Sequence, residues 1–244
     1  EYERLYNYAR VQQFQSQVLN HNERLKKLKA DRKKLANDVA SLNRRIKESV
    51  EKVRKIEGDI MGIRGPYGRG YPVEKFHDKE VLILGGGCGF APIRSLLFNL
   101  IAISDKLRKV TLCYGSKTPE DCIYKPYIQE LRNTPKFEVL RSVDQANGNW
   151  SERVGVVSVL LDDVKMDIKN SVAVVCGPPV MMKYGTMKLL EMGYPEHDIF
   201  LSMEKNMSCG LGKCGHCMMG KYLVCKDGTV FTYDEIKDQP YIWN

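Results

Sequence analysis

The first 57 residues contain no glycine and no proline, the residues that most often interrupt a helix. The chain of 244 residues also lacks an uncharged apolar run of about 18 residues, the minimum for a membrane-spanning helix. No secretory signal opens it, and half of its eight cysteines are clustered rather than spread as in a disulfide scaffold. We therefore expect no membrane insertion, reduced thiols and a cytoplasmic location.

The positive charge of the chain is concentrated at its start. Residues 1–57 hold 15 Lys and Arg against 8 Asp and Glu, whereas the remaining residues hold 23 against 22. No aromatic residues alternate with the lysines of "RLKKLKADRKK", although single-stranded nucleic acids are usually bound by such a mixture. Nucleic acid is therefore not an expected partner, and binding of this basic helix to an acidic surface stays open.

Apolar residues recur at alternating spacings of three and four along the same segment. One heptad position carries Val11, Val18, Leu25, Val39, Ile46 and Val53, and the other carries Phe14, Leu28, Leu35, Leu42 and Ile56. A seam of this period predicts a left-handed coiled coil over residues 1–57, formed with a partner helix or with a second copy of the chain. Gly58 ends the helix, and a loop rich in glycine and proline over residues 58–79 links it to the next domain.

A glycine-rich turn between a strand and a helix follows the linker. Val81 to Leu84 form a short apolar run, as in a strand that is covered on both faces. Pro92 suits the first position of a helix, and the turn before it contains Gly85, Gly86, Gly87 and Gly89. Such a turn leaves the backbone open to an anion and directs helix amides toward it, which predicts a phosphate site. A tight turn without a ligand is the alternative.

Further strands alternate with helices after this turn. "KVTLCYG", "EVLRSVD" and "SVAVVCGPP" predict three strands, with helical patterns over residues 121–133 and 180–192. This order predicts an α/β fold with a parallel sheet over residues 80–203, whose ligands bind at the carboxyl ends of the strands. "GGGCGF", "YGSKTPED" and "CGPPVM" each follow a strand, so we expect these three loops to meet in one crevice.

Four cysteines lie close together near the C-terminus. Their spacing is Cys209-x4-Cys214-x2-Cys217-x7-Cys225. It is typical of plant-type [2Fe–2S] ligation, whereas a zinc ribbon, the weaker alternative, usually offers two C-x2-C hooks. We therefore predict a [2Fe–2S] loop module over residues 204–244, with a strand over residues 222–225. His216 is expected to be a neighbour rather than a ligand, because four thiols already complete the site.

The sequence resembles a known family at five motifs. These are "RGPYGRGYP", "LILGGGCGFAPIRSLL", "YGSKTPED", "VVCGPPVMMKY" and the cysteine cluster. They are similar to the ferredoxin-reductase-type electron-transfer subunits, which include the gamma subunits of sulfhydrogenases and the corresponding subunits of anaerobic sulfite reductase and dihydroorotate dehydrogenase. The resemblance covers residues 61–244. It implies NAD(P)H, FAD and a [2Fe–2S] cluster as cofactors, and partner redox subunits of hydrogenase, sulfite reductase or dehydrogenase type.

The resemblance also implies roles for individual residues. Residues 85–92 would hold the pyrophosphate of NAD(P). Cys176 would be the catalytic residue beside the nicotinamide, with Gly177 and Pro178 as further cofactor contacts. The "GPYG" loop would lie near the flavin and consists of Gly65, Pro66, Tyr67 and Gly68.

The loop after the second predicted strand leaves the choice between NAD and NADP open. Gly115, Lys117 and Asp121 are the expected cofactor contacts in this loop. Lys117 could meet a 2′-phosphate, whereas Glu120 or Asp121 could bind a ribose hydroxyl. Both nucleotides therefore remain candidates.

The N-terminal segment departs from the family pattern. Family members carry an N-terminal β-barrel with an Arg-x-Tyr-Ser/Thr motif that grips the flavin, whereas here the predicted coiled coil occupies that place and "RLYN" at residues 4–7 lies within it. Three explanations stay open: the flavin is held without a barrel, a partner supplies the flavin, or this sequence lacks the barrel.

The predicted function is that of a diaphorase-type electron-transfer subunit of a larger oxidoreductase. Electrons would pass between NAD(P)H and a partner subunit through a flavin and the [2Fe–2S] cluster. A flavin is needed because a nicotinamide exchanges electrons in pairs, whereas an iron–sulfur cluster takes them singly. The alternative is a non-catalytic subunit that docks a partner through its coiled coil and keeps a vestigial nucleotide fold.

Overall fold

The computed structural model describes residues 27–28, 30–32, 64–148 and 150–243, and it divides the chain into two units after Arg64. In the first unit, residues 27–28 and 30–32 are helical, and the side chain of Leu28 is 64% exposed. The rest of the predicted coiled coil over residues 1–57 lies outside the described residues, so the coiled coil stays a prediction. None of the described helices is long and apolar enough to cross a membrane.

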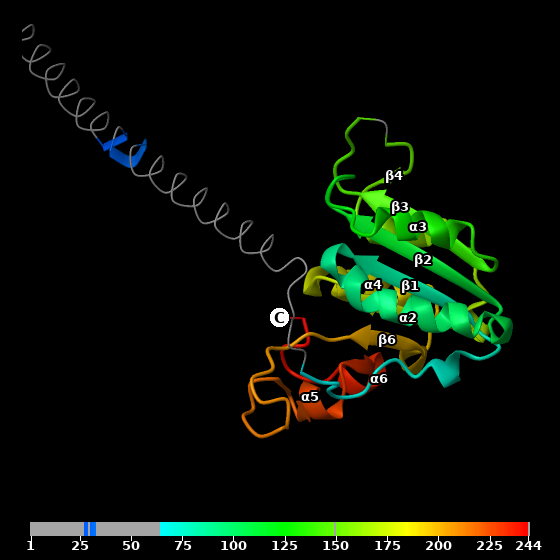
Figure 1. Cartoon of the computed structure of the whole chain (residues 1–244). Helices are drawn as coiled ribbons and strands as arrows, with labels where there is room; N and C mark the ends of the chain where they lie inside the picture. The colour runs from blue at the N-terminus through cyan, green and yellow to red at the C-terminus, as the bar shows by residue number, and fades with distance from the viewer. Residues whose placement is uncertain (1–26, 29, 33–63, 149, 244) are drawn as a thin grey trace, which may run out of the picture. The chain divides into compact units, whose positions relative to one another are not determined.

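The second unit is built on one seven-stranded sheet with the order β4-β3-β2-β1-β5-β6-β9 (Figure 1). The strands are β1 (Glu80–Gly86), β2 (Lys109–Ser116), β3 (Phe137–Val143), β4 (Arg153–Val154), β5 (Ser171–Cys176), β6 (Ile199–Ser202) and β9 (Val230–Thr232). All neighbours run parallel except β9, which is antiparallel to β6. The predicted parallel-sheet α/β domain is therefore confirmed, and the C-terminal segment adds its edge strand.

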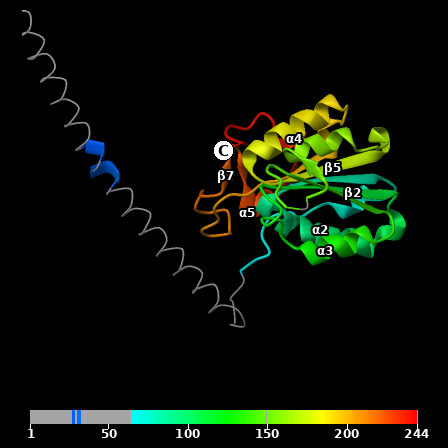
Figure 2. The same ribbon diagram turned by 90° about the horizontal axis from the view of Figure 1, so that it is seen from above.

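Helices cover both faces of this sheet. Figure 2 shows α2 (Phe90–Ala102) and α3 (Lys125–Arg132) on one face, with α4 (Pro179–Glu191) on the other. Alternate residues of β1 belong to the two cores: Val81 and Ile83 pack on the α2 side, and Leu82 and Leu84 on the α4 side. Because successive side chains of a strand point to opposite faces, a central strand must be apolar at every position. This explains the continuous apolar run in the sequence.

Two predicted boundaries around the glycine turn are wrong. Gly85 and Gly86 belong to β1, because their pairing with Tyr114 and Gly115 of β2 continues the parallel ladder. The turn itself is the short 3-10 helix η2 (Gly87–Gly89). Since α2 already begins at Phe90, Pro92 occupies its third position rather than its first, and it still lies within the first turn, where no intrahelical donor is lost.

Two further boundaries differ from the sequence-based expectation. The helix predicted over residues 121–133 begins only at Lys125, because Tyr124 before it adopts a left-handed backbone with φ of 53°. The strand predicted over residues 222–225 is half as long: β8 covers Tyr222–Leu223, and the helix α5 (Val224–Asp227) carries the last cysteine of the cluster. β7 (Met218–Met219) pairs with β8 in a small hairpin, and α6 (Tyr233–Ile236) follows β9.

The segment before β1 is more than a connection. Within the predicted linker of residues 58–79, the 3-10 helix η1 (Val73–Phe76) places Phe76 in the core with no exposed surface. Its ring packs edge-on against Phe200 of β6, with 5.3 Å between the ring centres. This contact anchors the described part of the linker to the sheet. The boundaries of the predicted domains at residues 80–203 and 204–244 stay predictions.

Candidate functional site

The loops after β1 and β5 lie side by side at the carboxyl edge of the sheet. Gly85 of β1 is the register partner of Cys176, the last residue of β5. A Cβ atom placed on Gly89 would lie 2.5 Å from the carbonyl oxygen of Cys176 and 2.6 Å from the Cα of Gly177. The two backbones therefore touch, which only glycine permits. This is also where the helices change faces between α2 and α4, the position at which open α/β sheets bind nucleotides.

Gly87 leaves an open space at the start of α2. Its backbone is left-handed, with φ of 53°, and a Cβ atom placed on it would have no other atom within 4 Å. The space adjoins the first turn of a helix of 13 residues, where free amides and the helix dipole favour an anion. The arrangement fits the pyrophosphate of a dinucleotide.

Two of the predicted cofactor residues serve the packing of the fold. A Cβ atom on Gly115 would lie 2.6 Å from the Cβ of Val157, so this glycine lets the 3-10 helix η4 (Val157–Asp162) approach β2. Pro178 precedes α4, and its Cδ would lie 3.4 Å from a Cβ placed on Gly86. Both residues shape the walls of the crevice through these contacts.

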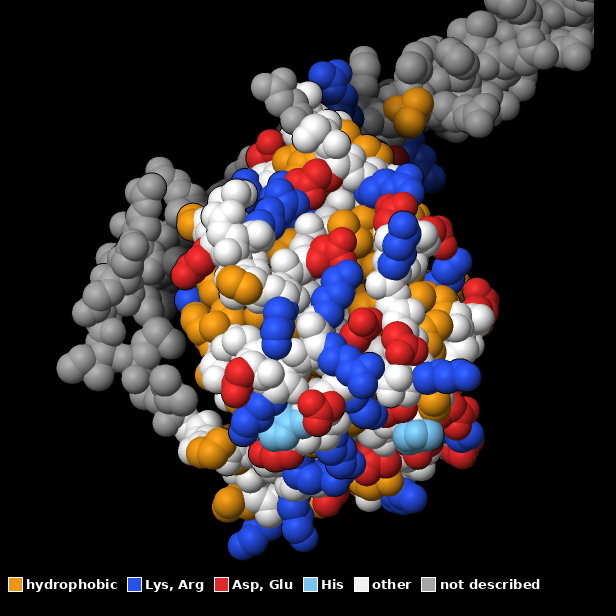
Figure 3. Space-filling view, turned by 90° about the vertical axis from the view of Figure 1, so that its right-hand side faces the viewer, with side chains coloured by type: hydrophobic (Ala, Val, Ile, Leu, Met, Phe, Trp, Pro, Cys, Tyr) orange, Lys and Arg blue, Asp and Glu red, His pale blue; other side chains and the backbone are white. Residues whose placement is uncertain are grey.

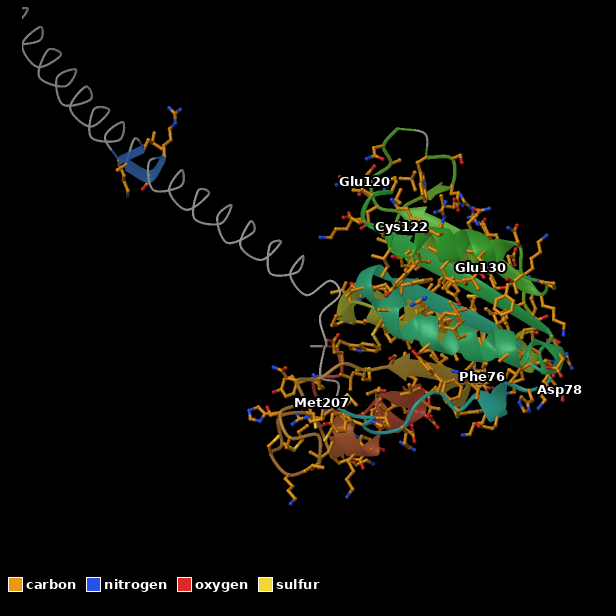
Figure 4. All side chains as sticks on the ribbon, in the orientation of Figure 1. Phe76, Asp78, Glu120, Cys122, Glu130 and Met207 are labelled. Atoms are coloured by element: carbon orange, nitrogen blue, oxygen red, sulfur yellow. The ribbon has the colours of Figure 1, made fainter. Side chains whose placement is uncertain are left out.

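The acidic residues after β2 are already engaged. The Asp121 carboxylate accepts a hydrogen bond of 3.0 Å from the Thr118 hydroxyl, and Glu120, labelled in Figure 4, accepts one of 2.7 Å from the Asn147 amide. Lys117 is exposed and forms no ion pair with any described residue. The two acidic residues considered as ribose ligands are thus engaged, whereas the Lys117 side chain has no ion-pair partner among the described residues.

Cys176 is a buried thiol with two polar neighbours that the sequence did not reveal. Burial raises its pKa to about 11, and hydrogen bonding with Ser202 opposes the rise. The thiol is therefore neutral near pH 7, so it is not a nucleophile there. The Tyr71 hydroxyl lies beside Ser202, but it is buried and has no hydrogen-bond partner among the described residues.

These neighbours had no signal in the sequence that linked them to Cys176. Burial raises the pKa of Tyr71, the charge of Cys176 adds to the rise, and Ser202 opposes it. Ser202 is thus close to the hydroxyl without completing a hydrogen bond in good geometry. A buried donor without a partner is unusual in a folded protein, and it is expected where a ligand completes the site.

The four clustered cysteines are free thiols that form two pairs. The Cys214 thiol lies beside that of Cys209, and the Cys217 thiol beside that of Cys225. Cys214 is exposed, whereas Cys217 and Cys225 are 2% and 3% exposed. No group of three or more His, Cys, Asp or Glu side chains in the described part of the chain is arranged to hold a single metal ion.

Backbone amides surround these thiols. The amides of Leu211 and Lys213 donate to the Cys209 sulfur over 3.3 and 3.4 Å, and the amide of Gly212 donates to the Cys225 sulfur over 3.3 Å. The first two lower the pKa of Cys209, which favours the thiolate. Thiolates are the form that binds metal, and amides directed at sulfur stabilise the negative charge of a cluster. The donor set fits two irons with two thiolates each.

The "GPYG" loop packs directly on the cluster loop. A Cβ atom on Gly210 would lie 2.4 Å from the Cζ of Tyr67, so the tyrosine ring covers the backbone beside Cys209. A Cβ on Gly68 would lie 2.8 Å from the carbonyl oxygen of Val224. Gly65 and Pro66 are exposed. Of the four residues predicted to lie near a flavin, Tyr67 and Gly68 therefore pack on the cluster segment.

Comparison with known proteins identifies the family. Residues 83–186 match the oxidoreductase NAD-binding domain, and residues 204–237 match the iron–sulfur cluster binding domain of dihydroorotate dehydrogenase B. The sulfhydrogenase 2 gamma subunit of Pyrococcus furiosus is 40% identical over 208 residues, which cover 78% of this chain and 72% of that protein. The chain belongs to this family of electron-transfer subunits. Its members are oxidoreductases that combine an NAD(P)-binding domain with an iron–sulfur domain, so the zinc alternative is not supported.

Two further proteins are similar to this electron-transfer subunit. The probable dihydroorotate dehydrogenase B (NAD(+)) electron transfer subunit of Pyrococcus horikoshii is 33% identical, over 76% of this chain and 66% of its own length. A solved chain of NADH-dependent reduced ferredoxin–NADP oxidoreductase shares the fold, with a TM-score of 0.55, 24% identity, and coverage of 74% of this chain and 63% of that one. The chain thus spans about two thirds of the length of these two proteins.

Proposed function

We propose that this chain exchanges electrons between NAD(P)H in the crevice and a partner redox subunit of hydrogenase or dehydrogenase type. The observation that carries the proposal is the shared core of the two sites. Leu84 of β1 and Val175 of β5 belong to the same buried cluster as Cys217 and Cys225. Because protein interiors are close-packed, this core fixes the spacing between the nucleotide loops and the iron–sulfur site.

The residues of the chain have separate parts in this exchange. The open space at Gly87 admits the pyrophosphate, and the neutral thiol of Cys176 borders the nicotinamide without attacking it. A flavin, when bound, would accept a hydride and release its electrons singly. Gly65 and Pro66 offer one exposed wall for that flavin. We infer that a partner or a segment outside the described residues completes the flavin site.

The first unit supplies a second contact with the complex. We propose that residues 1–57 form a coiled coil with a partner helix or with a second copy, in a cytoplasmic assembly. The described helical residues around Leu28 and the heptad seam in the sequence support this proposal. Replacing Leu35 and Leu42 with Glu is expected to dissociate the assembly in sedimentation equilibrium, because each change puts an unpaired charge in an apolar seam.

The test of the proposed function is reduction of the cluster by nucleotide. The full chain, purified anaerobically with its cluster, is mixed with NADPH or NADH, and the visible absorbance and electron paramagnetic resonance of the cluster are followed. We expect slow or no reduction by the chain alone, even with added FAD, and rapid reduction in the complex that is isolated with its flavin. Dithionite serves as the control that the cluster is reducible.

Two results would change the proposal. In one result, dithionite reduces the cluster, but NADPH and NADH leave it oxidised both in the chain with added FAD and in the isolated complex. This would favour the non-catalytic docking subunit instead. A chain that retains FAD through purification and reduces its cluster without added flavin would show that this chain holds the flavin without a partner.

A further inference from the structure

The segment that carries the cysteines differs in charge from the rest of the chain around it. Residues 205–226, the cluster segment, contain four lysines and no Asp or Glu. The remainder of residues 58–244 holds 19 Lys and Arg against 22 Asp and Glu. Figure 3 shows the opposite, amino-terminal edge of the sheet, where basic and acidic side chains alternate over the surface. The cluster segment is thus the positive end of an otherwise slightly negative unit.

Two large apolar side chains stand exposed within this segment. Leu211 is 68% exposed and Met218 is 62% exposed, and between them in sequence lies the exposed Cys214. Exposed apolar side chains beside a functional centre are typical of an interaction site. Because Cys217 and Cys225 are buried, the iron held by Cys209 and Cys214 would be the one nearer the surface.

Three lysines accompany these apolar side chains. Lys213, Lys221 and Lys226 are exposed, and none forms an ion pair with a described residue. A Cβ placed on Gly212 would lie 3.3 Å from the Cδ of Lys226, so that lysine lies against the loop of Leu211 and Lys213.

Met218 and Lys221 lie next to the cysteine loop because the β7–β8 hairpin packs on it. A Cβ placed on Gly212 would also lie 3.4 Å from the Cδ1 of Leu223, the strand partner of Met218. Lys221 occupies the turn of the same hairpin, between β7 and β8. The hairpin therefore packs on the cysteine loop, and its lysine and methionine adjoin the residues of that loop.

We propose that these residues form a docking surface for an acidic redox protein. The lysine surface, as we name it, consists of Leu211, Lys213, Met218, Lys221 and Lys226. It fits a partner whose own docking face has carboxylates around an apolar centre, because lysines at a rim steer an acidic partner while the apolar centre holds it. This inference rests on the proposed function, since it assigns the place where the cluster exchanges electrons.

The charge argues against two other occupants. The N-terminal segment, residues 1–57, carries an excess of seven positive charges, so it would be repelled by the lysines. A second copy of the chain would bring the same lysines to a symmetric contact, and like charges across an interface oppose association. Neither kind of repulsion arises with an acidic partner.

The test uses two protein acceptors of opposite charge. The full chain with its cluster is reduced with dithionite, freed of excess reductant, and mixed with acidic rubredoxin or with basic cytochrome c. For the unsubstituted chain we expect the rate with rubredoxin to fall as salt rises toward about 0.15 M, because screening removes the attraction. Lys213→Glu with Lys221→Glu should slow rubredoxin reduction about tenfold at low salt and accelerate cytochrome c reduction.

Matched variants separate docking from a general change of charge. The Lys165→Glu, Lys169→Glu variant changes the net charge by the same amount, at two exposed lysines that are distant in sequence from the lysine surface. It should leave both rates unchanged. Leu211→Ser should weaken rubredoxin binding in calorimetry without changing its salt dependence, because it removes apolar contact and no charge. Cluster absorbance verifies that each variant is intact.

Several outcomes would overturn the inference. Equal slowing by both lysine pairs, a rate independent of salt, or the same change in rate for both acceptors in the Lys213→Glu, Lys221→Glu variant would each do so. A change in sedimentation of the Lys213→Glu, Lys221→Glu variant would assign the surface to self-association instead. Because dithionite supplies the electrons, failure of NAD(P)H to reduce the cluster leaves this test unaffected.

Discussion

The nucleotide crevice and the cluster segment lie in one unit but are held in different ways. The loops of the crevice extend from β1 and β5, whose apolar side chains are almost without exposed surface. The cluster segment has only two strands of two residues each and the four-residue helix α5. We therefore expect the sheet to form the crevice before any ligand binds, and the fold of the cluster segment to depend on the metal that its thiols hold.

The two regions also differ in how many of their glycines have a left-handed backbone. Between Gly85 and Gly89 a single left-handed position, Gly87, opens the crevice. The cluster segment uses four, with φ between 56° and 76°, at Gly210, Gly212, Gly215 and Gly220. Left-handed glycines lose much conformational freedom on folding, so a loop rich in them needs another source of stability. In the cluster segment we expect the metal cluster to be that source.

The sharpest test of this comparison removes one ligand. Cys214→Ser should abolish the visible absorbance of the cluster and expose residues 205–226 to proteolysis, while NAD(P)H still binds. The purified unsubstituted chain should contain about two irons and two acid-labile sulfides. Absorbance spectra, metal analysis and limited proteolysis measure these effects.

The control for this prediction is a thiol of the sheet. Cys113 is buried in β2, and burial raises its pKa to about 12, so it is a neutral core side chain. Cys113→Ser should keep the cluster. Stoichiometric zinc without labile sulfide in the unsubstituted chain, or an unaltered spectrum for Cys214→Ser, would refute the assignment.

The second prediction tests whether the crevice is preformed. Gly87→Ala puts a methyl group into the open space at the start of α2, so the affinity for NAD(P)H should fall tenfold or more, about 1.4 kcal/mol. Fluorescence titration with NADPH measures the loss. Gly89 is unsuitable for this purpose, because a side chain there would collide with the backbone of Cys176 and disturb the fold.

Gly148→Ala is the matched control for Gly87→Ala. Gly148 has the same φ of 53° and the same absence of atoms within 4 Å of its Cβ position, but it lies in the loop after β3. Both variants should lose about 1–2 kcal/mol of stability from the strained backbone. Equal nucleotide affinity in the two would contradict a phosphate site at Gly87.

A smaller effect is expected at the other end of the crevice. Lys117→Ala should lower the affinity for NADPH about fivefold and leave that for NADH unchanged, because only NADPH brings a 2′-phosphate to the free cation. Lys106→Ala is the control, because Lys106 is an exposed lysine at the end of the 3-10 helix η3 (Ser104–Lys106) before β2. Equal losses of affinity for both nucleotides would show that Lys117 does not bind the 2′-phosphate.

An effect of similar size is expected at the edge of the sheet, where Glu152 pairs with Arg132 of α3 and Arg141 of β3. Burial would raise the pKa of Glu152, but hydrogen bonds from Arg141 and Arg132 outweigh burial and lower the pKa from its ordinary value of 4.5. A carboxylate with a lowered pKa stabilises the fold above the pKa of the unfolded chain, and this contribution is lost as the pH falls through the folded value. Glu152→Gln should therefore cost about 1 kcal/mol near pH 7 and very little below about pH 4.

Chemical denaturation at the two pH values checks this prediction. Cluster absorbance recorded in the same samples shows whether the sheet edge and the cluster segment respond separately. An equal loss of stability at both pH values would show that Glu152 contributes through packing rather than charge.

The sheet could be predicted from the sequence because its central strands are short apolar runs. The runs at Val81 and Val172 mark these strands, since only strands covered on both faces need apolar residues at successive positions. The glycines after the first run led to a wrong boundary, because glycine indicates a turn by its conformational freedom and the ladder with β2 overrides that signal at Gly85 and Gly86.

The site was only partly predictable for a related reason. The cysteine spacing indicates its chemistry in a local pattern, as does the glycine turn. Tyr71 and Ser202 meet Cys176 only through the tertiary fold, and the packing of Tyr67 on Gly210 joins segments more than a hundred residues apart. Contacts of this kind leave no periodicity or spacing in a single sequence.

The position of the cluster segment between β6 and β9 has a consequence for the modularity of the chain. These two strands are antiparallel neighbours, and the amide of Met203 donates to the carbonyl of Thr229 over 2.7 Å just beyond them. The cluster segment is thus a long hairpin connection, closed at its base by a ladder hydrogen bond. In place of residues 204–228, a short turn of the kind that joins ordinary hairpins would span the same gap. The cluster segment is thus an insertion between two paired strands, so its removal would leave the strand order of the sheet unchanged.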